Sequence, residues 1–226
     1  RNYIKRQLQL ELLGEVPVLS IRTEPLQNPV NRLAKRLFDL TFSSLFLLTI
    51  FPFMYLIVGL IIKITSPGPI FFKQERNGEN GKIFKCYKFR SMKVNALSDS
   101  LQATKNDPRK TKFGNFLRKS NLDELPQFIN VFKGEMSIVG PRPHMLKHTE
   151  EYSQLINKYM MRHLVKPGIT GWAQVTGYRG ETKELSQMEG RVRRDLWYIE
   201  NWTFLLDIRI MIKTVTNMFR GEKNAY

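Results

Sequence analysis

The stretch LTFSSLFLLTIFPFMYLIVGLII, residues 40–62, contains 23 residues and no formal charge. A straight helix rises about 1.5 Å per residue, so a helix of this length could cross the roughly 30 Å hydrocarbon core of a bilayer. Pro52 lies in its middle, where a proline removes one backbone hydrogen bond and clashes with the preceding turn. The stretch therefore predicts a membrane helix that is interrupted at Pro52.

Basic residues flank this apolar stretch on both sides. They are Arg32, Lys35, Arg36, Lys63, Lys73 and Arg76. Lys and Arg near membrane segments favour the cytoplasmic side. If both ends are cytoplasmic, the chain must enter the membrane, turn at Pro52 and leave by the same face. We therefore expect a re-entrant helix-break-helix over 32–64, with a single membrane span and a buried core helix as the two alternatives.

The whole chain is strongly basic, because 36 Lys and Arg residues against 20 Asp and Glu residues give a net charge of +16 at pH 7. Such a surplus indicates a polyanionic partner, and the apolar stretch favours anionic lipid headgroups. No nucleic-acid-binding signature is present, so we expect no nucleic acid partner. The one cysteine, Cys86, excludes an internal disulfide and fits a reducing compartment.

The apolar stretch divides the chain into three parts. The chain begins at Arg1 without an initiator Met, so we expect residues 1–31 to be a linker from a region upstream, with a strand at Val16–Ile21. Residues 32–64 are the membrane element, and residues 65–226 form a cytoplasmic domain that carries the chemistry. The expected fold class is α+β and mainly helical, with one β-hairpin and interfacial amphipathic helices.

Two β-rich runs predict the hairpin, because Asn and Gly turn residues separate them. The runs are 70–74 and Ile83–Phe89. Alternation along the second run places Cys86 and Lys88 on one face, and Arg90 follows directly after its end.

Other patterns predict the elements of the second half of the chain. Helical periodicity predicts helices over 94–104, 111–119, 150–165 and 204–219, and one helix or a helix pair over 183–201. Short apolar runs predict strands at 136–139 and 171–177. The last helix has one apolar face, which fits either packing in the core or lying in a membrane interface. This face consists of Leu205, Ile208, Ile212, Val215 and Phe219.

The adjacent carboxylates Asp123 and Glu124 have two interpretations. Ser120 and Asn121 precede them by three residues, which fits capping boxes that only stabilise the start of a helix. Pro126 follows at once, so a helix that begins near Asp123 would present both carboxylates at an exposed N-terminal tip. The helix dipole would keep a carboxylate ionised there, and a nucleophile needs that form.

Isolated arginines near the pair favour the chemical interpretation. Arg118 lies five residues before Asp123, and Arg142 is held between two prolines. Arginine binds phosphate bidentately, and two carboxylates can share a Mg²⁺ ion with substrate phosphates. The pattern indicates phosphoryl chemistry in which Asp123 attacks phosphorus. His144 and His148 could share a metal, but no third residue has the spacing of a zinc ligand.

Six motifs occur along the chain. They are KRLFD at 35–39, TSPGPIFFKQER at 65–76, KFRSM at 88–92, LRKSNLDELPQ at 117–127, SIVGPRP at 137–143 and KPGITGWAQV at 166–175. In this order they resemble the motifs of the bacterial sugar transferase family, the monotopic phosphoglycosyl transferases. The resemblance covers roughly residues 31–220, and the motifs are specific jointly although none is specific alone.

The resemblance implies a reaction and a role for each candidate residue. A UDP-sugar, UDP-glucose or UDP-galactose in the larger members, would give its sugar 1-phosphate to undecaprenyl phosphate and release UMP. Asp123 would be the nucleophile that forms a phosphosugar-enzyme intermediate, and Glu124 would help it hold Mg²⁺. The phosphate-binding or substrate-binding residues would be Arg90, Arg118, Arg142 and Asp195.

The resemblance also implies the re-entrant helix and a place in the bacterial inner membrane, with the catalytic domain on the cytoplasmic face. The reaction would be the first membrane step of exopolysaccharide, capsule or O-antigen synthesis. Membrane lipids would be partners, and a homodimer is one alternative for the assembly. The chain has Phe51-Pro52 where smaller members have Ser-Pro, and Thr49 is the candidate to bond the carbonyl that Pro52 frees. The alternative function is a non-enzymatic basic membrane scaffold that binds anionic lipid or polysaccharide.

Overall fold

The computed structural model describes residues 8–13, 16–21, 24–94, 107–180 and 184–220. Its helices are α1 (Pro29–Thr65), α2 (Lys112–Lys119), α3 (Gln127–Lys133), α4 (Leu146–Leu155), α5 (Trp172–Val175), α6 (Leu185–Glu200) and α7 (Phe204–Arg220). The 3-10 helices are η1 (Pro25–Gln27), η2 (Glu79–Gly81), η3 (Leu122–Glu124) and η4 (Tyr159–Leu164). The antiparallel strand pairs are β1 (Leu8–Leu13) with β2 (Val16–Ile21) and β3 (Phe71–Asn77) with β4 (Ile83–Phe89), and β5 (Ser137–Val139) pairs in parallel with β6 (Gly168–Thr170). The expected class, α+β and mainly helical, is confirmed.

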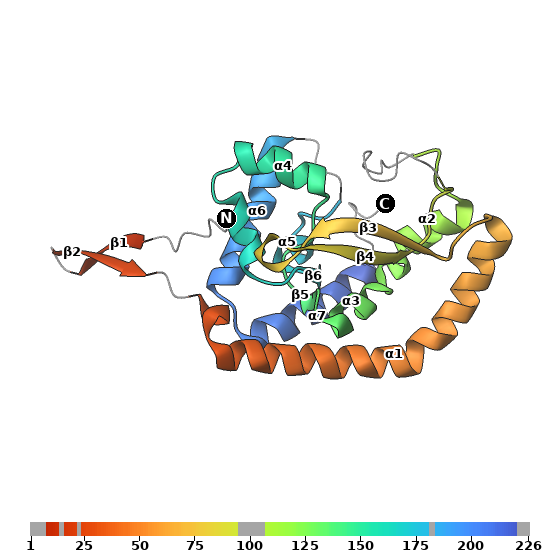
Figure 1. Ribbon diagram of the computed structural model, residues 1–226, viewed down its shortest axis with the longest axis horizontal. Coiled ribbons are helices and arrows are strands. Elements are labelled where there is room, and N and C mark those ends of the chain that lie inside the picture. Colours follow the sequence, from red (N-terminus) through yellow and green to blue (C-terminus); the bar gives the residue numbers. More distant parts are fainter. Residues whose placement is uncertain (1–7, 14–15, 22–23, 95–106, 181–183, 221–226) are drawn as a thin grey trace.

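Helix α1 is the longest element and lies along one side of the molecule (Figure 1). Asn28 Oδ1 accepts a hydrogen bond from Val30 N at 2.9 Å, and Pro29 occupies the first turn, where its missing N–H costs nothing. Within the described residues α1 is the one helix that is long and apolar enough to cross a bilayer. Only 17% of its most apolar window is buried, so the buried core helix is the wrong alternative.

The predicted break at Pro52 is a bend within a continuous helix. Figure 1 shows α1 turning in its second half, and Pro52 lies inside the helix. A proline at this position leaves the Leu48 carbonyl without its helical partner. The Thr49 hydroxyl donates to the Leu45 carbonyl at 2.7 Å, so it does not take the role that we expected at Leu48.

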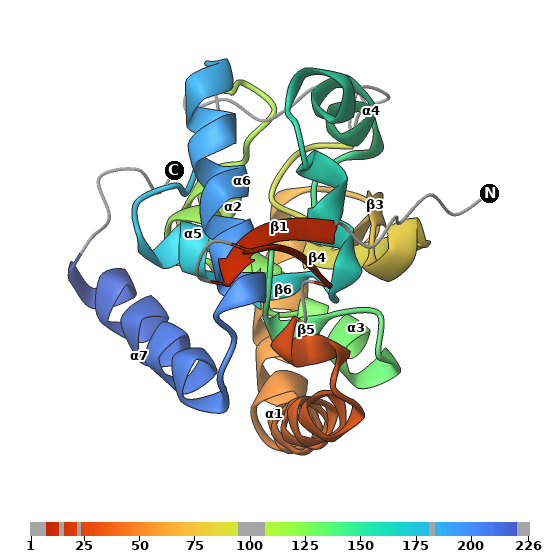
Figure 2. The same cartoon turned by 90° about the vertical axis from the view of Figure 1, so that its left-hand side faces the viewer.

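Both ends of α1 pack on the same body of the protein. Near its start, Asp39 Oδ1 accepts a hydrogen bond from Ile138 N of β5 at 3.0 Å. Near its end, Ile62 packs in a buried cluster with Phe89 of β4 and Leu117 of α2. Figure 2 shows α1 nearly end-on, on the side of the body opposite to α4. The bent helix therefore leaves and returns to one compact structure.

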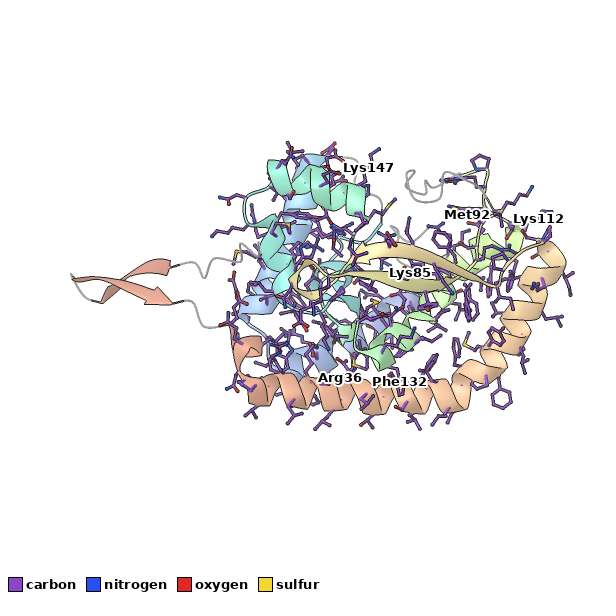
Figure 3. All side chains as sticks on the ribbon, in the orientation of Figure 1. Arg36, Lys85, Met92, Lys112, Phe132 and Lys147 are labelled. Carbon is purple, nitrogen blue, oxygen red and sulfur yellow. The ribbon has the colours of Figure 1, made fainter. Side chains whose placement is uncertain are left out.

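Polar contacts fasten the first turns of α1 to α3 and α7. The Arg36 guanidinium donates to the carbonyls of Val131 at 2.7 Å and Phe132 at 2.8 Å, at the end of α3 (Figure 3). Lys35 Nζ lies 2.5 Å from Asp207 Oδ2 of α7, and both residues are buried. These contacts fix the direction in which α1 leaves the body.

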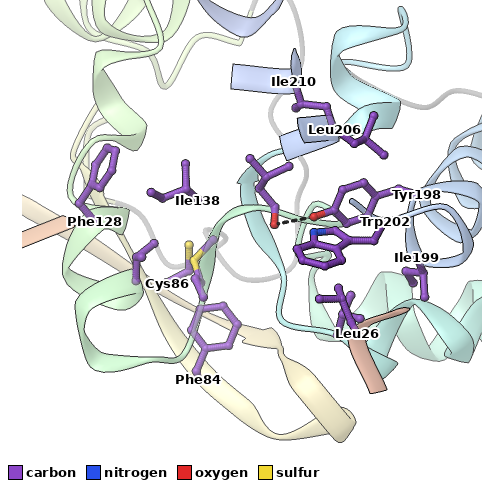
Figure 4. Packing of buried hydrophobic residues seen from close by; sticks show 14 residues of the cluster. Leu26, Phe84, Cys86, Phe128, Ile138, Tyr198, Ile199, Trp202, Leu206 and Ile210 are labelled. Atoms are coloured by element: carbon purple, nitrogen blue, oxygen red, sulfur yellow. Dashed lines mark hydrogen bonds between the residues drawn. The ribbon is translucent and has the colours of Figure 1, made fainter. Parts of the chain in front are cut away.

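The main core joins β4, α3, β5, α6 and α7 (Figure 4). Tyr198 is fully buried in it, and its hydroxyl lies 2.7 Å from Asp207 Oδ1 and 3.2 Å from the Val139 carbonyl. Cys86 of β4 is buried in the same core. In this core, α3 packs against both β5 and the hairpin strand β4.

Helix α7 is amphipathic, but its predicted apolar face does not enter the core. Leu205, Ile212 and Val215 are exposed by 78%, 59% and 52%, whereas Leu206 and Ile210 are buried. The core alternative is therefore wrong for these three residues of the face, which are left uncovered.

Several predicted elements are confirmed, namely the strand Val16–Ile21, the β3–β4 hairpin, α2, β5, α6 and α7. The helix predicted over 150–165 is confirmed only as far as Leu155, because Lys158 adopts a φ of +65° and separates α4 from η4. The strand predicted over 171–177 is wrong: the extended residues are those of β6, and α5 follows them as a short helix. The helix predicted over 94–104 lies outside the described residues, apart from Val94.

Candidate active site

A cavity of about 330 Å³ lies between the β3–β4 hairpin, η3 and the loop that follows β5. It is lined by all but one of the predicted site residues, namely Arg90, Arg118, Asp123, Glu124 and Arg142. Further basic lining residues are Arg76, Lys88, Lys93, Arg109, Arg179 and Arg191. Among the described residues that line the cavity, Asp123 and Glu124 are the only acidic ones. The site is thus one acidic pair in a cationic cavity, which suits a phosphorylated ligand.

The acidic pair lies in the turn η3 and not at the tip of a helix. Asn121 has a φ of +59° and starts η3, while α3 begins only after Pro126. The Ser120 hydroxyl donates to the Phe116 carbonyl at 2.9 Å, and neither Ser120 nor Asn121 caps η3, so the capping-box interpretation is wrong. The expectation of exposed carboxylates is also wrong, because η3 packs against β4 and buries both.

Two cations hold Glu124. Lys88 Nζ lies 2.7 Å from Oε1, and the Arg142 guanidinium donates to Oε1 at 2.6 Å and to Oε2 at 3.1 Å. Burial alone would raise the pKa of Glu124, but Arg142 and Lys88 outweigh burial and hold it well below its usual range. Glu124 is therefore an ionised carboxylate with both oxygens bonded. We call Lys88 and Arg142 the Glu124 clamp.

Asp123 is in the opposite situation. It is 6% exposed and lines the cavity, and its carboxylate accepts no hydrogen bond from the described part of the chain. Burial, with the charge of Glu124 beside it, raises the pKa of Asp123 to about 6, against the opposing effect of Lys88, Arg118 and Arg142. We expected a helix dipole to keep Asp123 ionised. The nearby cations favour the ionised form instead, and they offset only part of the effect of burial.

Arg118 and Arg90 both reach the cavity but differ in their surroundings. Arg118 lies in the last turn of the helix α2, whose first turn is capped by Thr111 Oγ1, which accepts from Gly114 N at 2.8 Å. The Arg90 guanidinium donates to the Pro67 carbonyl at 2.8 Å and also to the Ser66 carbonyl. Arg90 therefore also ties the end of α1 to β4, next to the cavity.

Asp195 does not line the cavity, and the prediction that it binds substrate is not supported by its position. It is 2% exposed and pairs with Arg162, whose Nε and Nη2 lie 2.8 Å and 2.7 Å from Oδ2. Arg162 Nη2 also donates to the Arg142 carbonyl at 2.8 Å. Asp195 thus acts through Arg162 on the backbone that carries Arg142, and it is a positioning residue.

His144 lines the cavity next to this network, although the sequence singled it out only as a weak metal candidate. Its Nδ1 lies 2.9 Å from Arg162 Nη1 and 2.6 Å from the Tyr159 hydroxyl. Arginine can only donate, so Nδ1 accepts and the proton of the neutral ring is on Nε2. Burial and the Arg162 charge hold the pKa of His144 well below its usual range. A metal pair with His148 has no support, since the described residues contain no group of three metal-binding side chains.

Sequence reasoning missed Lys88 as a site residue, although the signal was present. Strand alternation placed it on the face of β4 that also carries the buried Cys86. A lysine on the buried face of a strand needs an anionic partner, and that partner is Glu124. Arg191 was missed because it is one of several charged residues on α6, and no periodicity distinguishes it; it donates to the carbonyls of Tyr178 and Gly180 beside the cavity.

The donor set fits a Mg²⁺ ion only in part. Asp123 offers a carboxylate that accepts no hydrogen bond within the described residues, whereas both oxygens of Glu124 are bonded to the Glu124 clamp. Mg²⁺ is commonly held by one or two carboxylates together with substrate phosphates and water. Asp123 thus fits a ligand as it stands, and Glu124 fits one once a cation of the clamp is withdrawn.

Comparisons with known proteins identify relatives of the chain. The chain is 54% identical over 221 residues to the UDP-glucose:undecaprenyl-phosphate glucose-1-phosphate transferase of Escherichia coli strain K12, which is 96% of this chain and 47% of that protein. It is 45% identical over 194 residues to the exopolysaccharide production protein PSS of Rhizobium leguminosarum bv. phaseoli, 83% of this chain and 96% of that protein. It is 35% identical over 224 residues to an Aeromonas hydrophila UDP-N-acetylgalactosamine-undecaprenyl-phosphate N-acetylgalactosaminephosphotransferase, 97% of this chain and 52% of that protein.

The chain spans about half the length of the Escherichia coli and Aeromonas hydrophila relatives and nearly all of the Rhizobium one. The model of the bacterial sugar transferase family matches residues 30–221, from the start of α1 to the end of α7. This match includes the whole cavity and both residues of the acidic pair. The chain therefore belongs to the bacterial sugar transferase family.

Proposed function

We propose that the chain transfers glucose 1-phosphate from UDP-glucose to undecaprenyl phosphate and releases UMP. The printed names of several relatives, among them the Escherichia coli protein, describe this reaction. One observation carries the proposal for this chain. The buried carboxylate of Asp123 lines a cationic cavity and accepts no hydrogen bond within the described residues, while Lys88, Arg118 and Arg142 act on it electrostatically.

The proposed chemistry has two displacements at phosphorus. In the first, an Asp123 oxygen forms a bond to the β-phosphorus, and the bond from that phosphorus to the bridging oxygen breaks, so UMP leaves with the bonding electrons. In the second, an oxygen of the lipid phosphate attacks the same phosphorus and the Asp123 carboxylate is regenerated. Arg118 and Arg142 counter the negative charge that spreads over the phosphoryl oxygens.

Mg²⁺ is the proposed cofactor, and it would supply charge neutralisation at the diphosphate. Asp123 and Glu124 are the residues that would hold it. What this chain supplies by itself is orientation: Arg162 fixes the Arg142 backbone, and η3 buries Asp123 away from bulk water. Both effects bring the attacking oxygen and the phosphate together in one geometry.

A substrate panel tests the reaction. We expect purified protein with undecaprenyl phosphate and Mg²⁺ to release UMP fastest from UDP-glucose, compared with UDP-galactose and UDP-N-acetylgalactosamine. Faster release from UDP-galactose would change the proposed sugar. No UMP release from any donor, with membrane binding intact, would favour the non-enzymatic scaffold and overturn the proposal.

Radiolabel in the β-phosphate of UDP-glucose tests the covalent step. Without lipid phosphate, wild-type protein should become labelled, and a chase with undecaprenyl phosphate should move the label to the lipid. The Asp123→Asn variant should take up no label. Turnover by that variant at the wild-type rate would contradict the proposed nucleophile.

We further propose that α1 is re-entrant and that residues 65–226 lie on the cytoplasmic face of the inner membrane. Two observations support this topology. Both ends of α1 contact the same body, through Asp39 at one end and Ile62 at the other. Large apolar side chains are exposed between those ends, for example Leu48 at 80% and Phe53 at 70%. A straight span would carry one end away from that body.

Cysteine labelling tests the topology. Cys86 is buried and is the one cysteine of the chain, so it leaves the background low. Arg32→Cys and Lys63→Cys place thiols at the two exposed ends of α1, and we expect both to react with a membrane-impermeant reagent from the cytoplasmic side. Labelling from opposite sides would establish a span and overturn the re-entrant proposal.

A further inference from the structure

The Glu124 clamp has the geometry of a phosphate site that already holds an anion. Arg142 approaches the Glu124 carboxylate with two nitrogens, at 2.6 Å and 3.1 Å, and Lys88 approaches one of the same oxygens at 2.7 Å. A phosphoryl group presents oxygens of similar spacing to an arginine fork, which binds either anion in this way. The carboxylate of Glu124 therefore stands where a phosphoryl group could bind.

We propose that Glu124 is an internal competitor for the substrate diphosphate, which must take Lys88 and Arg142 from it on binding. The proposal deepens the proposed function and rests on it. It assigns Lys88 to phosphate binding, and it gives Glu124 two alternating partners: the Glu124 clamp before substrate binds, and a divalent cation afterwards.

The residues around the Glu124 clamp indicate whether Glu124 or the clamp moves when the diphosphate binds. Arg142 lies between Pro141 and Pro143, and its carbonyl accepts a hydrogen bond from the buried Arg162. Lys88 extends from the regular strand β4. Glu124 belongs to the single turn η3, and η3 has no side-chain cap at its start. The side chain of Glu124 can therefore rotate away from the clamp more readily than the backbone of Arg142 can shift.

Charge balance gives the exchange a consequence. Among the basic residues that line the cavity, three act most strongly on Asp123 (Lys88, Arg118 and Arg142), and the Glu124 carboxylate opposes them. With both carboxylates ionised, a doubly charged diphosphate would make the anions outnumber these cations. A divalent cation that enters with the diphosphate restores the balance and takes up the released carboxylate. Glu124 is thus the reason that nucleotide binding should depend on Mg²⁺.

Equilibrium binding of UDP measures this dependence without turnover. We expect the wild-type chain to bind UDP weakly in EDTA and at least about tenfold more tightly in saturating Mg²⁺, which corresponds to about 1.4 kcal/mol. Glu124→Gln removes the competing charge and keeps the side-chain shape. It should bind UDP about tenfold more tightly than wild type in EDTA and gain less than about threefold from Mg²⁺.

Matched variants separate the clamp from general charge effects. Glu79→Gln changes the net charge equally, but Glu79 pairs with Arg32 and does not line the cavity, so its UDP affinity should be that of wild type. Lys88→Met should weaken UDP binding with and without Mg²⁺. Lys85→Met, on the exposed face of the same strand, should leave it unchanged. If Glu124→Gln does not fold, Glu124→Asp shortens the reach to the clamp and should also bind UDP more tightly in EDTA.

The proposal would be overturned if Mg²⁺ raised the UDP affinity of Glu124→Gln (or Glu124→Asp) as much as that of wild type. It would also be overturned if Lys88→Met bound UDP with wild-type affinity. These outcomes are distinct from failure of the proposed function. Inorganic pyrophosphate is a second probe of the clamp, and it needs no sugar or lipid. Suppose that Glu124→Gln binds pyrophosphate more tightly than wild type does in EDTA, while no UDP-sugar releases UMP. The proposed function then fails, and the competition between Glu124 and the diphosphate stands. If UMP release is normal and neither ligand shows the exchange, the exchange fails alone.

Discussion

Two buried acid–base clusters can be compared, one at the cavity and one between α1 and α7. In the second, which we call the docking cluster, Asp207 accepts hydrogen bonds from Lys35 at 2.5 Å, Tyr198 at 2.7 Å and Trp202 at 3.0 Å. Both of its carboxylate oxygens are bonded, and the cluster does not line the cavity. At the cavity, Glu124 is bonded as completely, but Asp123 accepts no hydrogen bond from the described residues.

The difference separates a carboxylate that holds the fold from one that is available for chemistry. A buried charge is tolerated when its hydrogen bonds and counter-ions compensate for lost water, as at Asp207. Asp123 lacks the hydrogen bonds, and burial together with the Glu124 charge raises its pKa against the nearby cations. An under-satisfied buried carboxylate in a cavity is a candidate functional group, because a ligand can supply what the protein does not.

The largest expected effect is that of Asp123→Asn on turnover. The amide cannot attack phosphorus, so UMP release should fall at least about 10³-fold, as it does when a covalent nucleophile is removed. Membrane association should persist, because α1 and α7 are untouched. The measurement is UMP release from UDP-glucose, with flotation on liposomes as the control, and turnover within tenfold of wild type would contradict the assignment.

Substitutions in the docking cluster should change the free energy of unfolding and not the rate of the reaction. Asp207→Asn leaves Lys35 as a buried charge without its counter-ion, and should cost about 3–5 kcal/mol of the free energy of unfolding. Lys35→Met combined with Asp207→Asn should recover part of this loss and not all of it, because the unpaired cation is removed but the buried Asp39 loses the nearby Lys35 charge. Thermal unfolding in detergent measures both. A loss below about 1 kcal/mol in the single variant would show that the pair does not hold α1.

The comparison also shows what the sequence could predict. The motifs identified residues that the fold brings together, since five of the six predicted site residues line the cavity. The hairpin and α6 could be predicted, because turn residues and helical periodicity depend on residues close together in the chain. The burial of Asp123 and Glu124 could not, because it depends on η3 packing against β4, a strand more than thirty residues earlier.

Long-range contacts also decided the remaining errors. Asp195 could be found as an acidic position, but its role depends on Arg162, which lies 33 residues away in the chain. The apolar face of α7 was read correctly from periodicity, but periodicity does not say which side of the helix meets the core. Leu206, Asp207 and Ile210 meet it, and the docking cluster is the physical reason, because Asp207 must reach Lys35.

The pH dependence of the free energy of unfolding should also distinguish Asp123 from a fully hydrogen-bonded carboxylate. Its folded-state pKa is raised to about 6, so the folded state gains from protonation. The contribution of Asp123 is fully present below the unfolded-state pKa, near 3.9, and is lost as pH rises through about 6. The Asp123→Asn variant lacks this titration. Its free energy of unfolding relative to that of wild type should therefore be about 1–3 kcal/mol higher at pH 7 than at pH 4. Thermal unfolding at several pH values measures it, and a difference between the two proteins that is constant with pH would contradict the raised pKa.

The smallest expected effect is on the rate of the first half-reaction. Attack requires the Asp123 carboxylate, so single-turnover release of UMP, without lipid phosphate, should fall about tenfold between pH 7 and pH 5. UDP-glucose does not titrate in this range, and leaving out the lipid removes its phosphate from the profile. Because a cation beside Asp123 favours its ionised form, raising the Mg²⁺ concentration should move the midpoint below 6. A midpoint near 4 at the lowest Mg²⁺ concentration would contradict the raised pKa of Asp123, and the contrast between the two clusters would disappear.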